Sequence, residues 1–145
     1  MNTVRDTAGK SGRRSPVRIL FACVENSNRS QLAEAFGKMH AKGDFLFESA
    51  GSRPSGRVSP QAISALHRRG YDAAVHRSKG FDAIADRRWD AVITMGCGED
   101  CPVVAGRLRE DWALPDPAQL EGDAYERVVD EIERQVLDLL RRLAP

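Results

Sequence analysis

The sequence predicts an open α/β fold, in which a parallel sheet is covered by helices on both faces. Short apolar runs alternate with amphipathic stretches from residue 17 onward, an order typical of strand–helix–strand units. The chain has 145 residues and no internal repeat, which is long enough for one buried core. We therefore expect a single domain over residues 16–145, preceded by a polar, disordered tail over residues 1–15.

Four short segments are predicted to be strands. They cover residues 17–23, 45–50, 73–75 and 91–95. Each is rich in the apolar residues that a sheet buried on both faces requires. The third is only three residues long.

Helices are expected between and after these strands. The first carries apolar residues at helical spacing after residue 30, and Gly43 can end it, because glycine suits the left-handed position after a helix. The second covers residues 60–69, with Ser59 as its cap and Pro60 in its first turn. A short third helix is expected over residues 81–88.

The last helix has the clearest pattern in the chain. Asp123 can cap it, and a continuous apolar stripe follows at the spacing of one helix face. That stripe predicts a core-facing surface and not a partner site. Its members are Tyr125, Val128, Val129, Ile132, Val136, Leu139, Leu140 and Leu143.

Composition excludes several classes of function. A net charge of +1 gives no electrostatic basis for binding nucleic acid or a membrane surface. No apolar run reaches the roughly 18 residues of a membrane span, and the N-terminus lacks a secretory signal, so we expect a cytoplasmic protein, by default a monomer. Three cysteines in a reducing compartment favour reactive or metal-binding thiols over structural disulfides.

The segment from Cys23 to Ser30 is the strongest candidate site. A strand runs into Cys23, and a short loop then leads to a helix that opens near Ser30. In this arrangement loop amides and a helix N-terminus attract an anion and also stabilise a thiolate. Arg29 offers a planar fork to two oxygens of an oxyanion, and Ser30 can donate a hydrogen bond to the sulfur. Asn26 tolerates the left-handed backbone that such a loop needs.

The spacing C-x5-R alone is a loose pattern, and a buried cysteine with a chance arginine is its bland alternative. The strand–loop–helix context favours the anion site. The residues expected to bind the substrate are Val24, Glu25, Asn26, Ser27, Asn28, Arg29 and Ser30. Because an inward carboxylate would oppose an anion, we expect the Glu25 side chain to point outward.

VRILFACVENSNRSQLAEAF resembles the opening of the low-molecular-weight protein tyrosine phosphatase family and, within it, the thiol-dependent arsenate reductases. ESAGS at residues 48–52 is similar to that family's second-strand signature, and Asp116-Pro117 to its general-acid loop. The resemblance extends over about residues 17–143. It implies a four-stranded parallel sheet flanked by helices, with Cys23 as nucleophile, Arg29 and the loop amides as oxyanion binders, Ser30 as thiolate stabiliser and Asp116 as proton donor.

Two further cysteines distinguish a reductase from a phosphatase. Cys97 and Cys101 follow the predicted strand 91–95, and the carboxyl ends of parallel strands share one edge of the sheet. We therefore expect a three-cysteine relay, in which Cys97 attacks Cys23 and Cys101 then attacks Cys97. The segment after Asp116-Pro117 lacks the aromatic residue with which phosphatases of this family pack a phenol. A small inorganic ion therefore fits better than phosphotyrosine.

Other interpretations of these residues remain open. Cys97 and Cys101 could be zinc ligands or inert thiols, although His40, His67 and His76 match no zinc spacing and are expected at the surface. A phosphatase is the alternative enzyme, and a thiol-bearing oxyanion or metalloid sensor is the alternative outside enzymology. Trp112, near the acid loop, is expected in the core.

No metal and no bound cofactor are expected, only an external thiol reductant, thioredoxin or a low-molecular-weight thiol with a glutaredoxin-like partner. Some reductases of the family bind potassium, and Asn26, Glu34 and Ser49 match the positions that serve it. Lys79 falls where those proteins place an acidic ligand. Because an ammonium group there would repel the metal, we expect no potassium requirement. Glu34 is then expected to pair with Lys79 or another base, or to be solvated.

Overall fold

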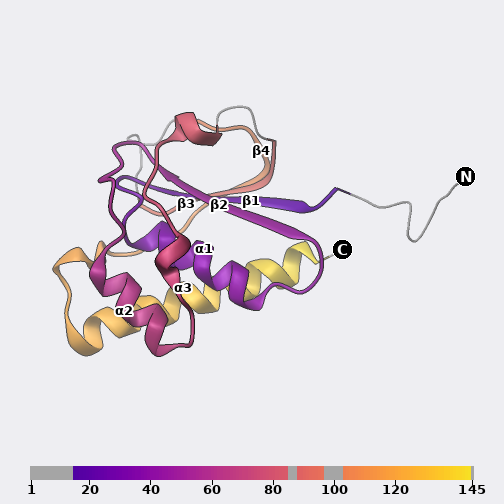
Figure 1. The fold of residues 1–145 in the computed structure, drawn as a ribbon. Coiled ribbons are helices and arrows are strands. Elements are labelled where there is room, and N and C mark those ends of the chain that lie inside the picture. The colour runs from indigo at the N-terminus through magenta and orange to yellow at the C-terminus, as the bar shows by residue number, and fades with distance from the viewer. Residues whose placement is uncertain (1–14, 85–87, 97–102, 145) are drawn as a thin grey trace, which may run out of the picture.

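The computed structural model describes residues 15–84, 88–96 and 103–144. Its centre is a parallel sheet of four strands in the order β2-β1-β3-β4 (Figure 1). The strands are β1 (Val17–Cys23), β2 (Phe45–Gly51), β3 (Trp89–Thr94) and β4 (Gly106–Asp111). The four-stranded parallel sheet is thereby confirmed. The predicted disordered tail lies outside the described residues, apart from Ser15.

The register of the sheet fixes where the site can form. Cys23 pairs with Gly51 of β2, and Ala22 pairs with Thr94 of β3. Because all strands run the same way, the carboxyl ends of β1, β2 and β3 meet at one edge of the sheet. Cys23 lies in the middle of that edge.

All three α-helices lie on the same side of the sheet (Figure 1). They are α1 (Arg29–His40), α2 (Pro60–Arg68) and α3 (Gly122–Leu143), and their buried residues form one cluster with Phe21 and Ile93 of the sheet. The opposite side carries a smaller cluster around Leu20 and Val92, covered by the 3-10 helix η2 (Phe81–Ile84). The described residues therefore cover the sheet on both faces, as predicted, with α-helices on one side and the short helix η2 on the other.

Two predicted elements take another form in the structure. Residues 73–75 form the 3-10 helix η1 (Ala73–Val75) and not a strand, because the Asp72 side chain accepts a hydrogen bond from the Ala74 amide and turns the chain. The expected helix over residues 81–88 contracts to η2, and residues 85–87 lie outside the described part.

The strand predictions from the apolar pattern also differ from the structure. The fourth strand, β4, is absent from the prediction. β3 begins two residues earlier than expected.

The helix ends agree with the sequence in part. Ser59 caps α2 by accepting a hydrogen bond from the Gln61 amide at 3.2 Å, as predicted. α1 ends at His40, so Gly43 lies in the turn that follows and not at the helix end. α3 begins at Gly122, which adopts a positive φ of 56°, so the helix starts one residue before Asp123, and Glu121 takes the cap position.

The predicted core assignments are confirmed. The apolar stripe of α3 is buried against the sheet, with the exception of Leu143, which is partly buried at its end. Trp112 is 6% exposed and its ring lies 5.9 Å from that of Phe21. None of the helices in the described residues has the length and apolar composition to cross a lipid bilayer.

Candidate active site

Cys23 is held in a chain of side-chain hydrogen bonds at the end of β1. Its sulfur is 2.8 Å from the hydroxyl oxygen of Ser30, and Asn26 donates to that oxygen from Nδ2, also at 2.8 Å. Because Asn26 already donates to the Ser30 oxygen, the Ser30 hydroxyl proton is free to point at the sulfur. All three residues are buried. The Ser30 hydroxyl is therefore placed to donate a hydrogen bond to the sulfur that acts as nucleophile in the proposed chemistry.

The conformation of the loop depends on two residues, Asn26, which has a left-handed backbone, and Gly51, which has no Cβ atom. Asn26 has a φ of 50°, the only positive φ of a non-glycine residue in the described chain, as the sequence predicted. Gly51, at the end of β2, lies directly against the loop. A Cβ atom at Gly51 would come within 2.5 Å of the Val24 carbonyl oxygen and 2.8 Å of the Asn26 amide nitrogen. The glycine of ESAGS therefore lets β2 approach the loop.

Arg29 begins α1 and reaches over the same pocket. One terminal nitrogen donates to the carbonyl oxygen of Leu114 at 3.3 Å. Its Nε is buried and has no hydrogen-bond partner within the described residues. A buried N–H group without a partner is costly. Arg29 is thus fixed through one nitrogen while another stays available for an oxyanion.

Asp116 lies on the wall of the pocket that contains Cys23 and Arg29. It is exposed, and its Oδ1 accepts a hydrogen bond from the Ala118 amide at 3.0 Å, which caps the 3-10 helix η4 (Pro117–Gln119). Asp116 therefore both caps a turn and lies at the pocket, so the two interpretations of this residue are compatible. The role of Asp116 as proton donor stays a prediction.

The remaining loop residues divide between the wall of this pocket and the layer beneath it. Val24, Glu25, Ser27 and Asn28 line the pocket, whereas Asn26 and Ser30 are buried under it. Glu25 is exposed, and its backbone carbonyl oxygen accepts hydrogen bonds from Ser55 and Ser78. The outward orientation of its side chain stays a prediction.

Six residues outside the predicted site also line the pocket. They are Ser59 and Gln61 at the start of α2, Gly96 after β3, Leu114, and Ala118 and Gln119 after the acid. Ser59 was predicted only as a helix cap, and nothing in the local pattern marks Gln61, Gly96 or Leu114, because their contact with the loop arises only when distant segments meet. A Cβ atom at Gly96 would come within 2.7 Å of an Arg29 nitrogen, so this glycine makes room for the guanidinium group.

The two relay cysteines, Cys97 and Cys101, lie outside the described residues. Gly96, the residue directly before Cys97, lines the pocket together with Cys23. The chain therefore leads from the pocket wall into the segment that carries both cysteines. The expected contact between Cys23 and Cys97 stays a prediction.

Two of the three residues that match a potassium site, Glu34 and Ser49, form a hydrogen bond with each other. Glu34 is 4% exposed, accepts a hydrogen bond from Ser49 at 2.5 Å and forms an ion pair with Lys38 at 2.6 Å, using one oxygen for each. Both carboxylate oxygens of Glu34 thus have a protein partner, and the expected absence of a potassium requirement stays a prediction. Of the alternatives open for Glu34, the structure selects another base than Lys79: Lys38, one turn along α1, pairs with Glu34, whereas the Lys79 ammonium group lies 3.8 Å from Glu48.

His76 is buried, so its expected surface position is wrong. Gln31 donates through Nε2 to Asn26 and to the Arg77 carbonyl, so its Oε1 accepts from His76 Nδ1, at 2.8 Å. Tyr71 then donates to Nε2 at 2.7 Å. This bonding describes a neutral ring, and burial lowers the pKa of His76. No group of three or more His, Cys, Asp or Glu side chains within the described ranges could hold a metal.

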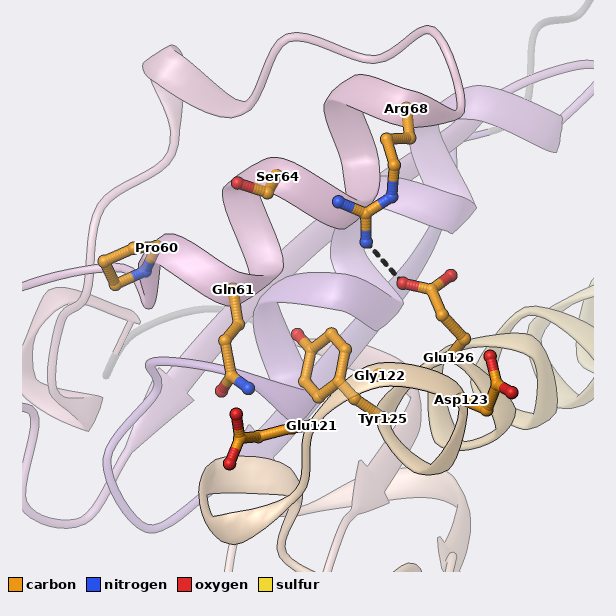
Figure 2. Close-up of a pocket in the computed structure, with 9 residues that line it drawn as sticks. All are labelled: Pro60, Gln61, Ser64, Arg68, Glu121, Gly122, Asp123, Tyr125 and Glu126. Atoms are coloured by element: carbon orange, nitrogen blue, oxygen red, sulfur yellow. Dashed lines mark hydrogen bonds and ion pairs between the residues drawn. The ribbon is translucent and has the colours of Figure 1, made fainter.

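α3 contacts the loop through Tyr125. Its hydroxyl donates to Oδ1 of Asn28 at 2.9 Å, and both side chains are buried. Burial raises the pKa of Tyr125, so the hydroxyl stays protonated and can donate at every moderate pH. Tyr125 also borders a second groove, between α2 and the start of α3, which adjoins the first pocket at Gln61 (Figure 2).

Comparison with known proteins agrees with this geometry. The family model described as low molecular weight phosphotyrosine protein phosphatase matches residues 18–145. Arsenate reductase 1 of Staphylococcus haemolyticus is 34% identical over 128 residues, covering 86% of this chain and 96% of that protein. The glutaredoxin arsenate reductase of a Synechocystis species is 31% identical, with 88% and 98% covered. A solved Corynebacterium glutamicum thioredoxin-dependent arsenate reductase superimposes with a TM-score of 0.72 at 32% identity, covering 92% of this chain and 64% of that one.

Proposed function

The chain belongs to the low-molecular-weight phosphotyrosine protein phosphatase family, and we propose that within this family it is an arsenate reductase working through a three-cysteine relay. The observation that carries the proposal is the Cys23 sulfur held against the Ser30 hydroxyl in a pocket shared with Arg29 and Asp116. Curated relatives of more than 30% identity that are named arsenate reductases support the choice of substrate.

In the first step the Cys23 thiolate attacks the As(V) atom of arsenate. An S–As bond forms, and one oxygen leaves as water after Asp116 donates a proton to it. The Arg29 Nε, which has no partner among the described residues, and the loop amides bind the remaining oxygens. The arsenic is still in its pentavalent state at this point.

In the second step Cys97 supplies the electrons. Its thiolate attacks the Cys23 sulfur, the electron pair of the S–As bond passes to arsenic, and arsenite leaves as a Cys23–Cys97 disulfide forms. Cys101 then attacks Cys97, which releases Cys23 as a thiolate and leaves a Cys97–Cys101 disulfide. An external dithiol reduces that disulfide, so two electrons enter for each arsenate reduced.

A pair of assays tests the relay. With Cys97→Ser and Cys101→Ser, we expect multiple-turnover arsenate reduction to be lost, while arsenate still consumes the Cys23 thiol once. Cys23→Ser should be inactive in both assays. Full multiple-turnover activity of either relay variant would contradict the three-cysteine mechanism without affecting the role of Cys23.

The reductant is the second part of the proposal. One similar protein is named for glutaredoxin and another for thioredoxin, so both systems are candidates. NADPH consumption should be arsenate-dependent with thioredoxin and its reductase, or with glutaredoxin, glutathione and glutathione reductase. If neither system supports turnover, the proposal that one of them reduces the Cys97–Cys101 disulfide is wrong.

Hydrolysis of aryl phosphates is the second candidate activity, because the same pocket suits phosphate, which is nearly isosteric with arsenate. It needs Cys23, Arg29 and Asp116 but neither relay cysteine. Hydrolysis that persists unchanged in both relay variants, without any arsenate reduction in the wild type, would favour a phosphatase.

A further inference from the structure

We infer that Gln61 is a positioning residue that holds the acid loop of Asp116 in register with the cysteine loop. This inference rests on the proposed function, because it assumes that Asp116 donates a proton. Gln61 belongs to the first turn of α2, an element with no assigned part in the chemistry. It borders both the catalytic pocket and the neighbouring groove.

The start of α2 is joined to the cysteine loop on one side. The Ser59 amide donates to the Ser27 carbonyl oxygen at 2.8 Å. Ser59 in turn caps the helix by accepting a hydrogen bond from the Gln61 amide. The backbone of Gln61 is therefore fixed relative to the loop that holds the Cys23 sulfur.

On the other side the Gln61 side chain reaches the acid loop. Its Nε2 donates to the Leu120 carbonyl oxygen at 2.7 Å. Figure 2 shows this amide extending from α2 toward the chain at Glu121, the residue after Leu120. Two short steps, Ser27 to Ser59 and Gln61 to Leu120, thus connect the nucleophile loop with the acid loop.

The acid loop is built so that an anchor at Leu120 controls Asp116. Asp116 accepts from Ala118, and the Leu120 amide donates back to Pro117 at 3.0 Å, which makes residues 116–120 one compact turn. Arg29 holds the near end of this segment through Leu114. Gln61 holds the far end. Without it, the turn can pivot about Leu114 and carry the exposed Asp116 away from the sulfur.

The test is a double-mutant cycle on the first step, measured as the single-turnover loss of the Cys23 thiol with excess arsenate. Displacement of a catalytic group by 1 Å can cost about 100-fold, so we expect Gln61→Leu to slow this step by about 10-fold or more. Phosphate, as a competing oxyanion, should bind to within about twofold of wild type, because the cysteine loop is unchanged. Gln61→Glu keeps the shape without the donor and should be slow as well.

The matched control is Gln135→Leu, the same substitution on α3, where the side chain donates to Glu131 away from the pocket. It should leave the rate unchanged. Thermal unfolding of each variant shows whether a slow rate merely reflects lost stability.

The decisive comparison uses Asp116→Asn. If Gln61 acts through Asp116, Gln61→Leu slows the wild type but adds nothing in the Asp116→Asn background. Equal slowing in both backgrounds, or none in either, overturns the inference while the role of Asp116 stands. If Asp116→Asn reacts at the wild-type rate, Asp116 is not the proton donor, and the inference about Gln61 is overturned as well.

Discussion

At the scale of single residues, the direction of one hydrogen bond decides the chemistry of the pocket. Asn26 donates to the Ser30 oxygen, and this leaves the Ser30 proton for the Cys23 sulfur. The same Asn26 accepts from Gln31 and from the Lys79 amide, so its amide orientation is fixed from the other side. The donor to the sulfur is therefore set by a buried chain and does not depend on solvent.

Ser30→Ala tests this chain. A hydrogen bond to a charged group contributes about 1.5–3 kcal/mol, so Cys23 should react with iodoacetamide about 10-fold or more slowly at a fixed, neutral pH. Ser27→Ala is the control, since Ser27 lies in the same loop but the sulfur's partner is Ser30. An unchanged alkylation rate in Ser30→Ala would show that the hydroxyl does not stabilise the thiolate.

Tyr125→Phe tests the contact between α3 and the loop. It removes only the hydroxyl and leaves the buried Oδ1 of Asn28 without its donor, so we expect a loss of about 1–3 kcal/mol in the free energy of unfolding. Urea denaturation of Tyr125→Phe, Asn28→Ala and the double variant measures the coupling. Additive effects would mean that the two groups contribute independently.

At the scale of elements, the end of β2 shapes the loop that follows β1. Gly51→Ala would place a Cβ within 2.8 Å of two loop atoms, both of them backbone. We expect overpacking to cost about 1–3 kcal/mol of stability and to weaken phosphate binding, measured by calorimetry, because the loop has to move.

Gly80→Ala is the matched control for that variant. Gly80 lies beside Gly51 in an isolated parallel bridge, yet its nearest neighbour would be 3.5 Å from an added Cβ, an ordinary contact distance. Phosphate affinity should stay at the wild-type level. Equal losses in the two variants would indicate that the strand, and not the loop contact, is sensitive.

The sequence predicted the strands and helices whose apolar residues follow a clear local pattern. It missed the elements and residues whose structure depends on contacts with distant parts of the chain. β4 has the sequence GRLRED, and its many charged residues do not form the apolar run of a buried strand. In the described residues it pairs with β3 on one side. His76 was predicted at the surface because its partner Gln31, which is 45 positions away in the chain, cannot be identified from the local pattern. The cysteine loop was predictable because its signal is local. Gln61 was not, because its role depends on a bond across 59 positions.

At the scale of the whole molecule, buried His76 makes stability depend on pH. Its pKa is lowered in the folded state, chiefly by burial, while the nearby Glu34 works in the opposite direction. The unfolded chain therefore binds the proton first, and stability should fall as the pH drops below about 6.5. His76→Gln should flatten this slope in urea titrations between pH 7 and 5, whereas His67→Gln, at an exposed site, should not.

The ion pair of Glu34 with Lys38 leads to a prediction about salts. Because Lys38 already supplies the positive charge beside Glu34, potassium and sodium chloride at equal concentration should give the same melting temperature. Lys38→Met should lower that temperature, since it leaves a buried carboxylate unpaired. A specific rise with potassium in the wild-type protein would show that the metal competes successfully with the ammonium group.

The outermost strand has a consequence for behaviour in concentrated solution. Among the described residues, β4 has a neighbouring strand on one side only, and four of its six residues, Arg107, Arg109, Glu110 and Asp111, are ionic. A second molecule that tried to extend the sheet there would have to bring its own chain alongside these hydrated groups. The charged residues that made β4 hard to predict from the sequence therefore also discourage aggregation of the folded protein through this edge.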